Sequence, residues 1–240
     1  MIEVLDCGVI DYATAWHEQQ KHFEALLARS NQPDADHPHE PNGILMLCEH
    51  PHVYTLGKSG HANNLLVSET FLKRIGASYY HIDRGGDITY HGYGQLVGYP
   101  ILDLSTIGAH GLGLKEYIHR LEMSVIDTIA EWGISGQCVE HATGVWLPAT
   151  AGAANQRPKP ERKICAIGVK ASRYVTMHGF ALNVTTDLKY FSYINPCGFT
   201  DKGVTSIAAE LADTDQPVPT MDEVKKKYTQ HFMRLFGNPE

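Results

Sequence analysis

The 240-residue sequence lacks several features that would place a protein quickly in a class. No apolar run approaches the roughly 20 residues needed to span a bilayer. The opening MIEVLDCGVI carries acids but no basic cluster, unlike a secretory signal. The formal net charge of -7 argues against a broad nucleic-acid-binding surface. We therefore expect a soluble, cytoplasmic protein with neither nucleic acid nor membrane as a partner.

Cysteine pairs and metal-ligand pairs are scarce as well. The cysteines are five, an odd number at wide spacings, which makes a disulfide framework improbable. Histidines number fourteen, but no CxxC or HxxxH pair brings two metal ligands close together along the chain. We accordingly predict no structural metal and no cofactor.

Apolar periodicity predicts helices and strands that interleave without a strict βαβ rhythm. Hydrophobic residues make up 43% of the chain, enough for a full core, and no repeat or linker is visible. The expected helices span residues 11–30, 68–76, 114–132 and 220–236, and Thr220 with Glu223 forms a capping box for the last. The expected strands span residues 2–6, 44–50, 53–57, 78–83, 95–101, 138–141, 144–148, 164–171 and 174–185. We predict an α/β (α+β) fold in one domain, 1–240, with a mixed or antiparallel sheet flanked by helices.

The segment from Arg84 to Gln95, RGGDITYHGYGQ, contains four glycines. It matches neither GxGxxG nor the GxxxxGK[ST] phosphate loop, so nucleotide binding is not indicated. Its glycines would suit a close approach of the backbone to another ligand, including an acyl thioester. His91 and His178 each precede a glycine; each is either a pocket-lining residue or a hydrogen-bonded histidine of a sheet.

Cys197 and Lys163 are the candidates for covalent chemistry. Cys197 stands between Pro196 and Gly198, in a turn that would leave its thiol uncrowded, although a small residue filling a turn is the alternative. Lys163 opens an expected strand and could be simply a solvated strand-end lysine. A catalytic role requires it to lie near Cys197, where its ammonium would favour the nucleophilic thiolate.

Four segments together resemble the lipoyl(octanoyl) transferases of lipoate biosynthesis. They are EHPHVYTLG (49–57), RGGDITYHGYGQLVGYPILDL (84–104), KICAIGVKASRYVTMHGFALNV (163–184) and INPCGF (194–199). The resemblance covers about residues 44–204. It departs from the family at Tyr93, where proline is usual, and in a longer loop at 149–160.

The resemblance implies a catalytic domain like that of biotin and lipoate protein ligases. The donor would be octanoyl-acyl carrier protein, and the acceptors would be apo lipoyl domains of 2-oxoacid dehydrogenase E2 subunits and the glycine cleavage H protein. The catalytic pair would be Cys197 and Lys163, not Lys170, with His178 in a supporting role. The substrate-binding residues implied are Arg84, Gly85, Gly86, Asp87, Ile88, Thr89, Tyr90, His91, Ala166, Ile167, Gly168, Gly179, Phe180 and Ala181.

The expected reaction has two steps: Cys197 takes the octanoyl group as a thioester, and an acceptor lysine then removes it. Three alternatives stay open from the residues. One is an ATP-dependent lipoate or biotin protein ligase, and another is a cysteine hydrolase using Cys197 with His178 or His91. The third is a non-catalytic binder of lipoyl domains.

Overall fold

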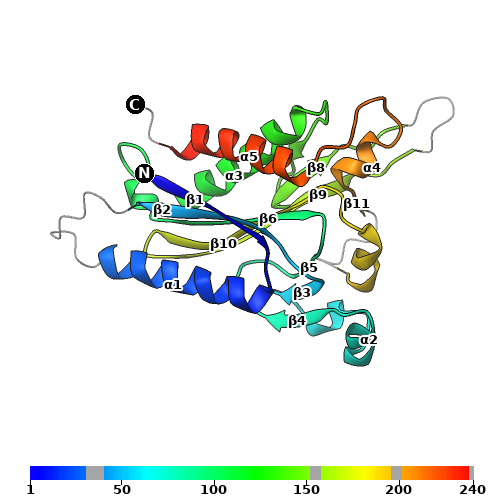
Figure 1. Cartoon of the computed structure of the whole chain (residues 1–240), viewed down its shortest axis with the longest axis horizontal. Coiled ribbons are helices and arrows are strands. Elements are labelled where there is room, and N and C mark those ends of the chain that lie inside the picture. Colours follow the sequence, from blue (N-terminus) through cyan, green and yellow to red (C-terminus); the bar gives the residue numbers. More distant parts are fainter. Residues whose placement is uncertain (31–40, 152–157, 196–201, 238–240) are drawn as a thin grey trace.

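The computed structural model describes residues 1–30, 41–151, 158–195 and 202–237. A large sheet orders its strands β1-β2-β6-β10-β9-β8-β7, with β11 added to β9, and a small sheet orders them β4-β3-β5 (Figure 1). The main-sheet strands are β1 (Ile2–Val9), β2 (Gly43–Glu49), β6 (Gln95–Leu102), β7 (Gln137–Cys138), β8 (Gly144–Leu147), β9 (Arg162–Ser172), β10 (Val175–Asn183) and β11 (Gly203–Val204). The small-sheet strands are β3 (Val53–Leu56), β4 (Ser78–His81) and β5 (Ile88–His91).

Both sheets are mixed, as the sequence predicts. In the main sheet β1 pairs with β2 and β11 with β9 in parallel, whereas the remaining neighbours are antiparallel. In the small sheet β3 runs parallel to β4 and antiparallel to β5. Strands β9 and β10 form a long antiparallel hairpin in the main sheet, paired from Ser172 and Val175 to Cys165 and Leu182.

Helices cover both faces of the main sheet. Figure 1 shows α1 (Tyr12–Ser30) on one face, and α3 (Leu114–Ala130) with α5 (Met221–Phe236) on the other. Side chains of β2 alternate between these faces, as a strand requires. Ile44 and Met46 pack in the cluster beneath α1, whereas Leu45 and Leu47 pack beneath α3 and α5.

The helix boundaries follow local signals. Thr220 Oγ1 accepts from the Glu223 N–H and the Glu223 carboxylate accepts from the Thr220 N–H, so the predicted capping box is present. The third helix ends at Ala130, before the predicted Trp132, and Gly133 follows with φ of 70°. Between 68 and 76 the helix is shorter than predicted: α2 covers Glu69–Arg74, capped by Ser68.

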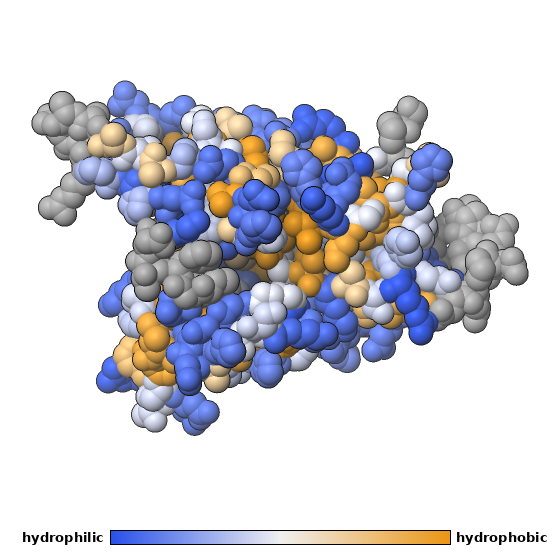
Figure 2. Space-filling view, turned by 180° about the vertical axis from the view of Figure 1, so that it is seen from behind, coloured by the Kyte–Doolittle hydropathy of each residue, from blue (hydrophilic) through white to orange (hydrophobic). Residues whose placement is uncertain are grey.

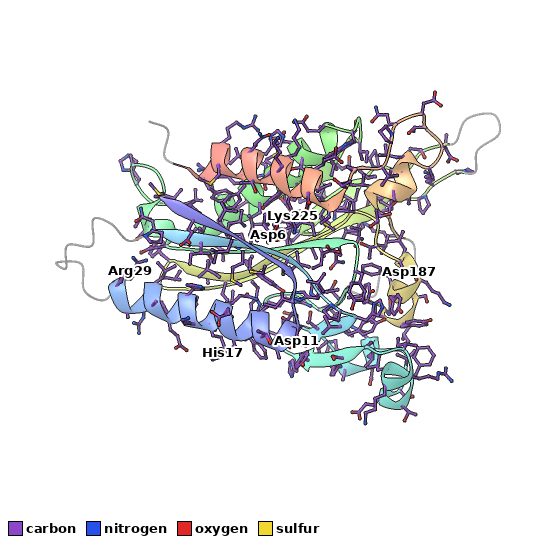
Figure 3. All side chains as sticks on the ribbon, in the orientation of Figure 1. Asp6, Asp11, His17, Arg29, Asp187 and Lys225 are labelled. Carbon is purple, nitrogen blue, oxygen red and sulfur yellow. The ribbon has the colours of Figure 1, made fainter. Side chains whose placement is uncertain are left out.

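Polar contacts tie the ends of the chain to the layers. Lys225 of α5 pairs with Asp6 of β1 at 2.7 Å, and Figure 3 shows the two side by side. Arg29, in the last turn of α1, donates to the Pro41 carbonyl at 2.8 Å, just before β2. Within the described ranges, none of the helices has both the length and the apolarity that crossing a bilayer demands.

Several short elements were not predicted. They are the strands β5 and β11, the helix α4 (Ile207–Leu211), and the 3₁₀-helices η1 (Ala62–Asn64), η2 (Leu104–Thr106) and η3 (Leu188–Tyr193). The predicted strand at 138–141 keeps only the pair Gln137–Cys138. The loop at 149–160 closes as a hairpin through Thr150 and Lys159, and its residues 152–157 lie outside the described ranges.

Candidate active site

A cavity of about 420 Å³ lies where the small sheet, η3 and the β8–β9–β11 end of the main sheet meet. Its volume is in the range of small-molecule sites. The predicted site residues that line it are Arg84, Gly86, Asp87, Ile88, Thr89, Lys163, Ala166, Ile167 and Ala181. The structure therefore brings together segments 84–89, 163–167 and 181, which are far apart in the sequence.

A second, smaller cavity of about 50 Å³ adjoins the first and shares part of its wall. Five residues line both: Arg84, Thr89, Ala166, Ile167 and Ala181. The other predicted residues lining the smaller cavity are His91, Gly168, His178, Gly179 and Phe180. The larger cavity therefore reaches Lys163, and the smaller one reaches His178.

Two predicted substrate residues line neither cavity. Tyr90 is fully buried on the far face of β5, where its hydroxyl lies 2.7 Å from His52 Nδ1. Strand alternation explains this, since Thr89 and His91 take the cavity side. Gly85 lies behind the cavity wall, and its N–H donates to the Val169 carbonyl at 2.9 Å.

The glycine-rich segment holds Arg84 against the sheet. The guanidinium is buried and donates to the Thr55 carbonyl at 2.7 Å and to the Gly85 carbonyl at 3.0 Å. Gly168 of β9 permits this approach, because a Cβ there would lie 2.8 Å from the Gly85 oxygen. A fixed cation thus borders both cavities.

A β-bulge directs Lys163 toward the larger cavity. The register between β8 and β9 shifts at Val145 and Trp146, so that Ile164 is an extra residue. Ile164 and Cys165 both pack in the core beneath α3 and α5, although consecutive strand residues normally face opposite sides. The bulge therefore turns the preceding side chain, Lys163, off the core face and onto the cavity.

The contacts of the Lys163 ammonium include a backbone carbonyl and an aromatic ring. Its Nζ donates to the Thr143 carbonyl at 3.2 Å and lies 4.6 Å from the centre of the Trp146 ring. The Lys202 ammonium lies 4.7 Å from the centre of the same ring. An aromatic face attracts cations, so Trp146 holds two of them at the cavity.

His178, which lines the smaller cavity, forms a hydrogen-bonded pair with Asp83. The ring Nε2 lies 3.0 Å from Asp83 Oδ1, and Lys170 Nζ lies 2.6 Å from Asp83 Oδ2. The hydrogen bond from His178, aided by Lys170, lowers the pKa of Asp83 despite its partial burial. Burial lowers the pKa of His178, so the ring is neutral at pH 7. His178 has φ of 61°, a strained conformation of the kind found at functional positions.

His91 is neutral as well. Burial, with His50 nearby, lowers its pKa to about 3, and its Nδ1 lies 2.9 Å from Gln95 Oε1. Both His91 and His178 therefore line a cavity and are hydrogen-bonded within the sheets. They line the smaller cavity and not the larger one, where His141 is the histidine found among the described residues. This separation argues against pairing either with a nucleophile beside Lys163.

Cys197 lies outside the described residues, as does the whole stretch 196–201. The residues that flank this stretch, Asn195 and Lys202, both line the larger cavity. The four described cysteines are Cys7, Cys48, Cys138 and Cys165. Burial is the first cause that raises the pKa of each of these thiols, to about 11 in the case of Cys138. None of the four is poised as a thiolate at pH 7.

The face of the molecule opposite to that seen in Figure 1 is hydrophobic in its middle. Figure 2 shows a band of hydrophobic residues between hydrophilic regions, with the surface hollowed at one end of the band. The partly buried apolar residues that pack against the core beneath α3 and α5 include Ile118 of α3 and Ile167 and Val169 of β9.

Three residues of the site were missed by the sequence analysis: Thr143, Trp146 and Lys202. Each contacts Lys163 or shares its aromatic neighbour, yet Trp146 reaches Lys163 only through pairing of β8 with β9. Local sequence does not encode that register. The adjacent apolar residues Ile164 and Cys165, which break the alternation of a strand, were a readable signal of the bulge.

Comparison with known families gives one extensive match. Residues 11–233 match the family described as lipoyl protein ligase A/B catalytic domain. An octanoyltransferase of Bacteroides thetaiotaomicron is 53% identical over 234 residues, which cover 98% of this chain and 95% of that protein. An octanoyltransferase of Parabacteroides distasonis is 51% identical over 234 residues, covering 97% of each.

Solved structures give the same fold at low sequence identity. A bipartite lipoate protein ligase from Thermoplasma acidophilum aligns with a TM-score of 0.63 at 15% identity, covering 98% of this chain and 84% of that one. Lipoate-protein ligase A bound with ATP aligns with a TM-score of 0.62 at 14% identity, with the same coverage. These likenesses confirm the predicted ligase-like architecture.

Proposed function

This chain belongs to the lipoyl protein ligase A/B catalytic-domain family and is an octanoyltransferase enzyme of protein lipoylation, and we propose that Cys197 and Lys163 perform its transfer. The observation that carries the proposal is the larger cavity itself. It is lined by Lys163 and by both described residues, Asn195 and Lys202, that flank the segment containing Cys197.

Chain connectivity supports Cys197 as the nucleophile. Cys197 is two residues beyond Asn195, so their Cα atoms are at most about 7.6 Å apart. The four cysteines that the structure describes are kept protonated at pH 7 by their surroundings. Cys197 is the remaining cysteine of the five.

Lys163 would first lower the pKa of the Cys197 thiol and would then exchange protons with the leaving thiolate and the attacking amine. A free thiol has a pKa of about 8.5, so a few per cent is ionised at pH 7. An ammonium that lowers this pKa by two units would supply roughly 2.7 kcal/mol. A lower pKa raises the ionised fraction of the thiol by at most about 30-fold, and the intrinsic nucleophilicity of the thiolate falls as its pKa falls. We therefore expect Lys163 to have a second role, which is to transfer protons during the reaction.

The reaction would proceed through two acyl transfers. The Cys197 thiolate attacks the thioester carbonyl of the donor, the donor carbon–sulfur bond breaks, and the leaving thiolate takes a proton from the Lys163 ammonium. The acceptor amine then attacks the carbonyl of octanoyl-Cys197 and passes a proton to Lys163, and the carbon–sulfur bond to Cys197 breaks, which releases the amide and regenerates the thiolate. Exchange of one thioester for another is nearly balanced in free energy and the final amide is more stable, so the route needs no ATP.

The donor would be octanoyl-acyl carrier protein. The acceptors would be lipoyl domains of 2-oxoacid dehydrogenase E2 subunits and the glycine cleavage H protein, acting with this enzyme in the cytoplasm. The apolar walls of the cavities, from Ile88, Ala166, Ile167 and Ala181, suit a medium-length acyl chain. Backbone N–H groups near Cys197 or Gly168 would stabilise the oxyanion.

Intact-protein mass spectrometry tests the proposal. The chain is mixed with octanoyl-acyl carrier protein, without acceptor and without ATP, and its mass is followed. The wild-type chain should gain one octanoyl group that hydroxylamine removes, as expected of a thioester. Adding an apo lipoyl domain should move the group onto that domain as a stable amide.

Matched variants separate the alternatives. Cys197→Ala should gain no octanoyl group, whereas Cys7→Ser, which changes a partly buried cysteine of β1, should behave as wild type. A labile acyl group on Cys197→Ala would refute the assignment. A requirement for ATP would instead indicate a ligase, and free octanoate released without acceptor would indicate a hydrolase.

A further inference from the structure

Three side chains with metal-binding atoms meet on the α3 side of the main sheet, and none of the three lines either cavity. They are His119 and Glu122 of α3 and Cys138 of β7, and their ligand atoms all lie within 4.8 Å of one another. His119 and Glu122 are three residues apart on a helix, so they share one face. Cys138 reaches them only because β7 adds to the edge of the sheet next to α3.

Glu122 is the unusual member, because its carboxylate is buried with 8% of the residue exposed. Its Oε1 accepts the Gly144 N–H at 3.0 Å, and none of the ion pairs between described residues includes it. A buried carboxylate is normally balanced by a cation or a proton. The thiol of Cys138 lies beside this carboxylate, and burial followed by the charge of Glu122 raises the pKa of that thiol to about 11.

We propose that His119, Glu122 and Cys138 bind one Zn²⁺ ion. Imidazole nitrogen, carboxylate oxygen and thiolate sulfur are the three ligand types that zinc takes in proteins. A tetrahedral zinc ion with bonds of 2.0–2.3 Å separates its ligand atoms by about 3.3–3.8 Å. Side-chain rotations that move the ligand atoms by about 1 Å would bring them to these separations. A water molecule would take the fourth position.

Charge balance favours zinc over the harder divalent ions. On binding, the Cys138 S–H bond breaks, the proton passes to the buffer, and a sulfur–zinc bond forms. The thiolate and the Glu122 carboxylate together neutralise the ion, while His119 binds as a neutral ring. Mg²⁺ and Ca²⁺ prefer oxygen ligands and would not displace the thiol proton. His119 and Cys138 are both exposed, so an ion can enter from solvent.

The site also borders the wall of the larger cavity. Glu122 holds the Gly144 N–H, and the preceding residue, Thr143, supplies the carbonyl that accepts from Lys163. Zinc bound to Glu122 would therefore fix the start of β8 beside the catalytic lysine. Sequence reasoning predicted no metal site, because these ligands come from a helix and a strand that are apart in the chain.

Cobalt substitution tests the proposal directly. The reduced, chelator-treated full chain is titrated with CoCl₂, and the thiolate-to-cobalt charge-transfer band is recorded before zinc is added in competition. Wild-type protein should show one equivalent of the band, which zinc abolishes. Cys138→Ser should lose the band and bind zinc at least about 100-fold more weakly, and His119→Gln about 10-fold more weakly.

Control variants exclude other thiols and other histidines. Cys7→Ser, Cys197→Ser and His110→Gln, an exposed histidine outside the cluster, should keep the band at full intensity. The melting temperature should rise with zinc in these controls and not in Cys138→Ser. A band that persists in Cys138→Ser, or disappears in Cys197→Ser, would place the metal elsewhere and overturn the proposal, as would a wild-type chain with no saturable binding.

Discussion

The two ends of β9 each carry a lysine, and the surroundings of these two residues differ. Lys170 is paired with the Asp83 carboxylate at 2.6 Å, and its ammonium lies over the Phe23 ring of α1. Lys163 donates to a carbonyl and lies over the ring of Trp146. Both are partly buried, so exposure alone does not distinguish them.

The two lysines also differ in their access to the larger cavity, which Lys163 lines and Lys170 does not. The ion pair with Asp83 holds the Lys170 side chain in place, which suits a structural cation. Under the proposed mechanism, Lys163 exchanges protons with the reacting groups from the wall of the larger cavity. Lys170 shares its partner Asp83 with His178, which lines the smaller cavity.

Replacing Lys163 with methionine should have the largest effect on activity. The side-chain volume is kept but the ammonium is lost, so octanoyl transfer should fall by about 10²- to 10⁴-fold in kcat/KM. Lys115→Met, an exposed lysine of α3, provides the matched control and should retain full activity. Activity of Lys163→Met within threefold of the control would show that the two ends of β9 do not differ in this way.

Enlarging a side chain between the two ends should change the acyl-chain preference. Ala181 of β10 pairs with Ala166 near the middle of β9 and lines both cavities. Ala181→Met should reduce transfer of octanoyl more than of butanoyl groups, because each excluded methylene forfeits about 0.8 kcal/mol, roughly fourfold.

The check on Ala181→Met is kcat/KM measured across donors from four to ten carbons. Ala171→Met, an exposed position on β9, should leave the order of preference unchanged. An equal loss for all chain lengths in Ala181→Met would mean that the acyl tail does not occupy these cavities.

Replacing Lys170 with methionine should affect stability more than activity. Loss of the partly exposed pair with Asp83 should lower the free energy of unfolding by about 0.5–1 kcal/mol. Transfer activity should change by less than about threefold if Lys170 only supports the fold. Urea unfolding monitored by tryptophan fluorescence gives the first quantity, and a rate like that of Lys163→Met would reverse the roles assigned here.

The pH dependence of stability should show the smallest effect. The pKa of Asp83 is lowered in the folded chain, so its ionised form stabilises the fold above its unfolded pKa of about 3.9. That contribution is lost as pH falls below about 4 through the folded value.

Asp83→Asn should therefore be less stable than wild type at pH 7, by about 1 kcal/mol because the carboxylate is more than a third exposed. The two proteins should converge at low pH in denaturant titrations. A gap that widens on acidification would show that Asp83 is not stabilised by its partners.

Sequence patterns predicted the parts of the fold whose signals are local. The period of the apolar residues and the Thr220–Glu223 capping box fixed α1, α3 and α5 to within two residues. The strand β5 was overlooked because ITYH lies within a glycine-rich stretch typical of a loop, although Ile88 and Thr89 are β-branched and alternate in direction.

Sequence motifs selected candidate site residues but could not give their arrangement in space. Motif resemblance selected Arg84, Lys163 and His178, which do line the two cavities. It also selected Tyr90, which strand alternation turns into the core of the small sheet. The pairing of Trp146 with Lys163 depends on a bulge and on strand register, which are properties of the folded sheet.

The most direct test of the account is the pKa of the Cys197 thiol, measured from the rate of its alkylation by iodoacetamide between pH 5 and 10 and quantified by peptide mass mapping. The four other cysteines have raised pKa values and should react slowly below pH 8. We predict a Cys197 pKa below 7 in the wild-type chain and a value about 8.5 or above in Lys163→Met. The same pKa in both proteins would contradict the claim that Lys163 activates the nucleophile.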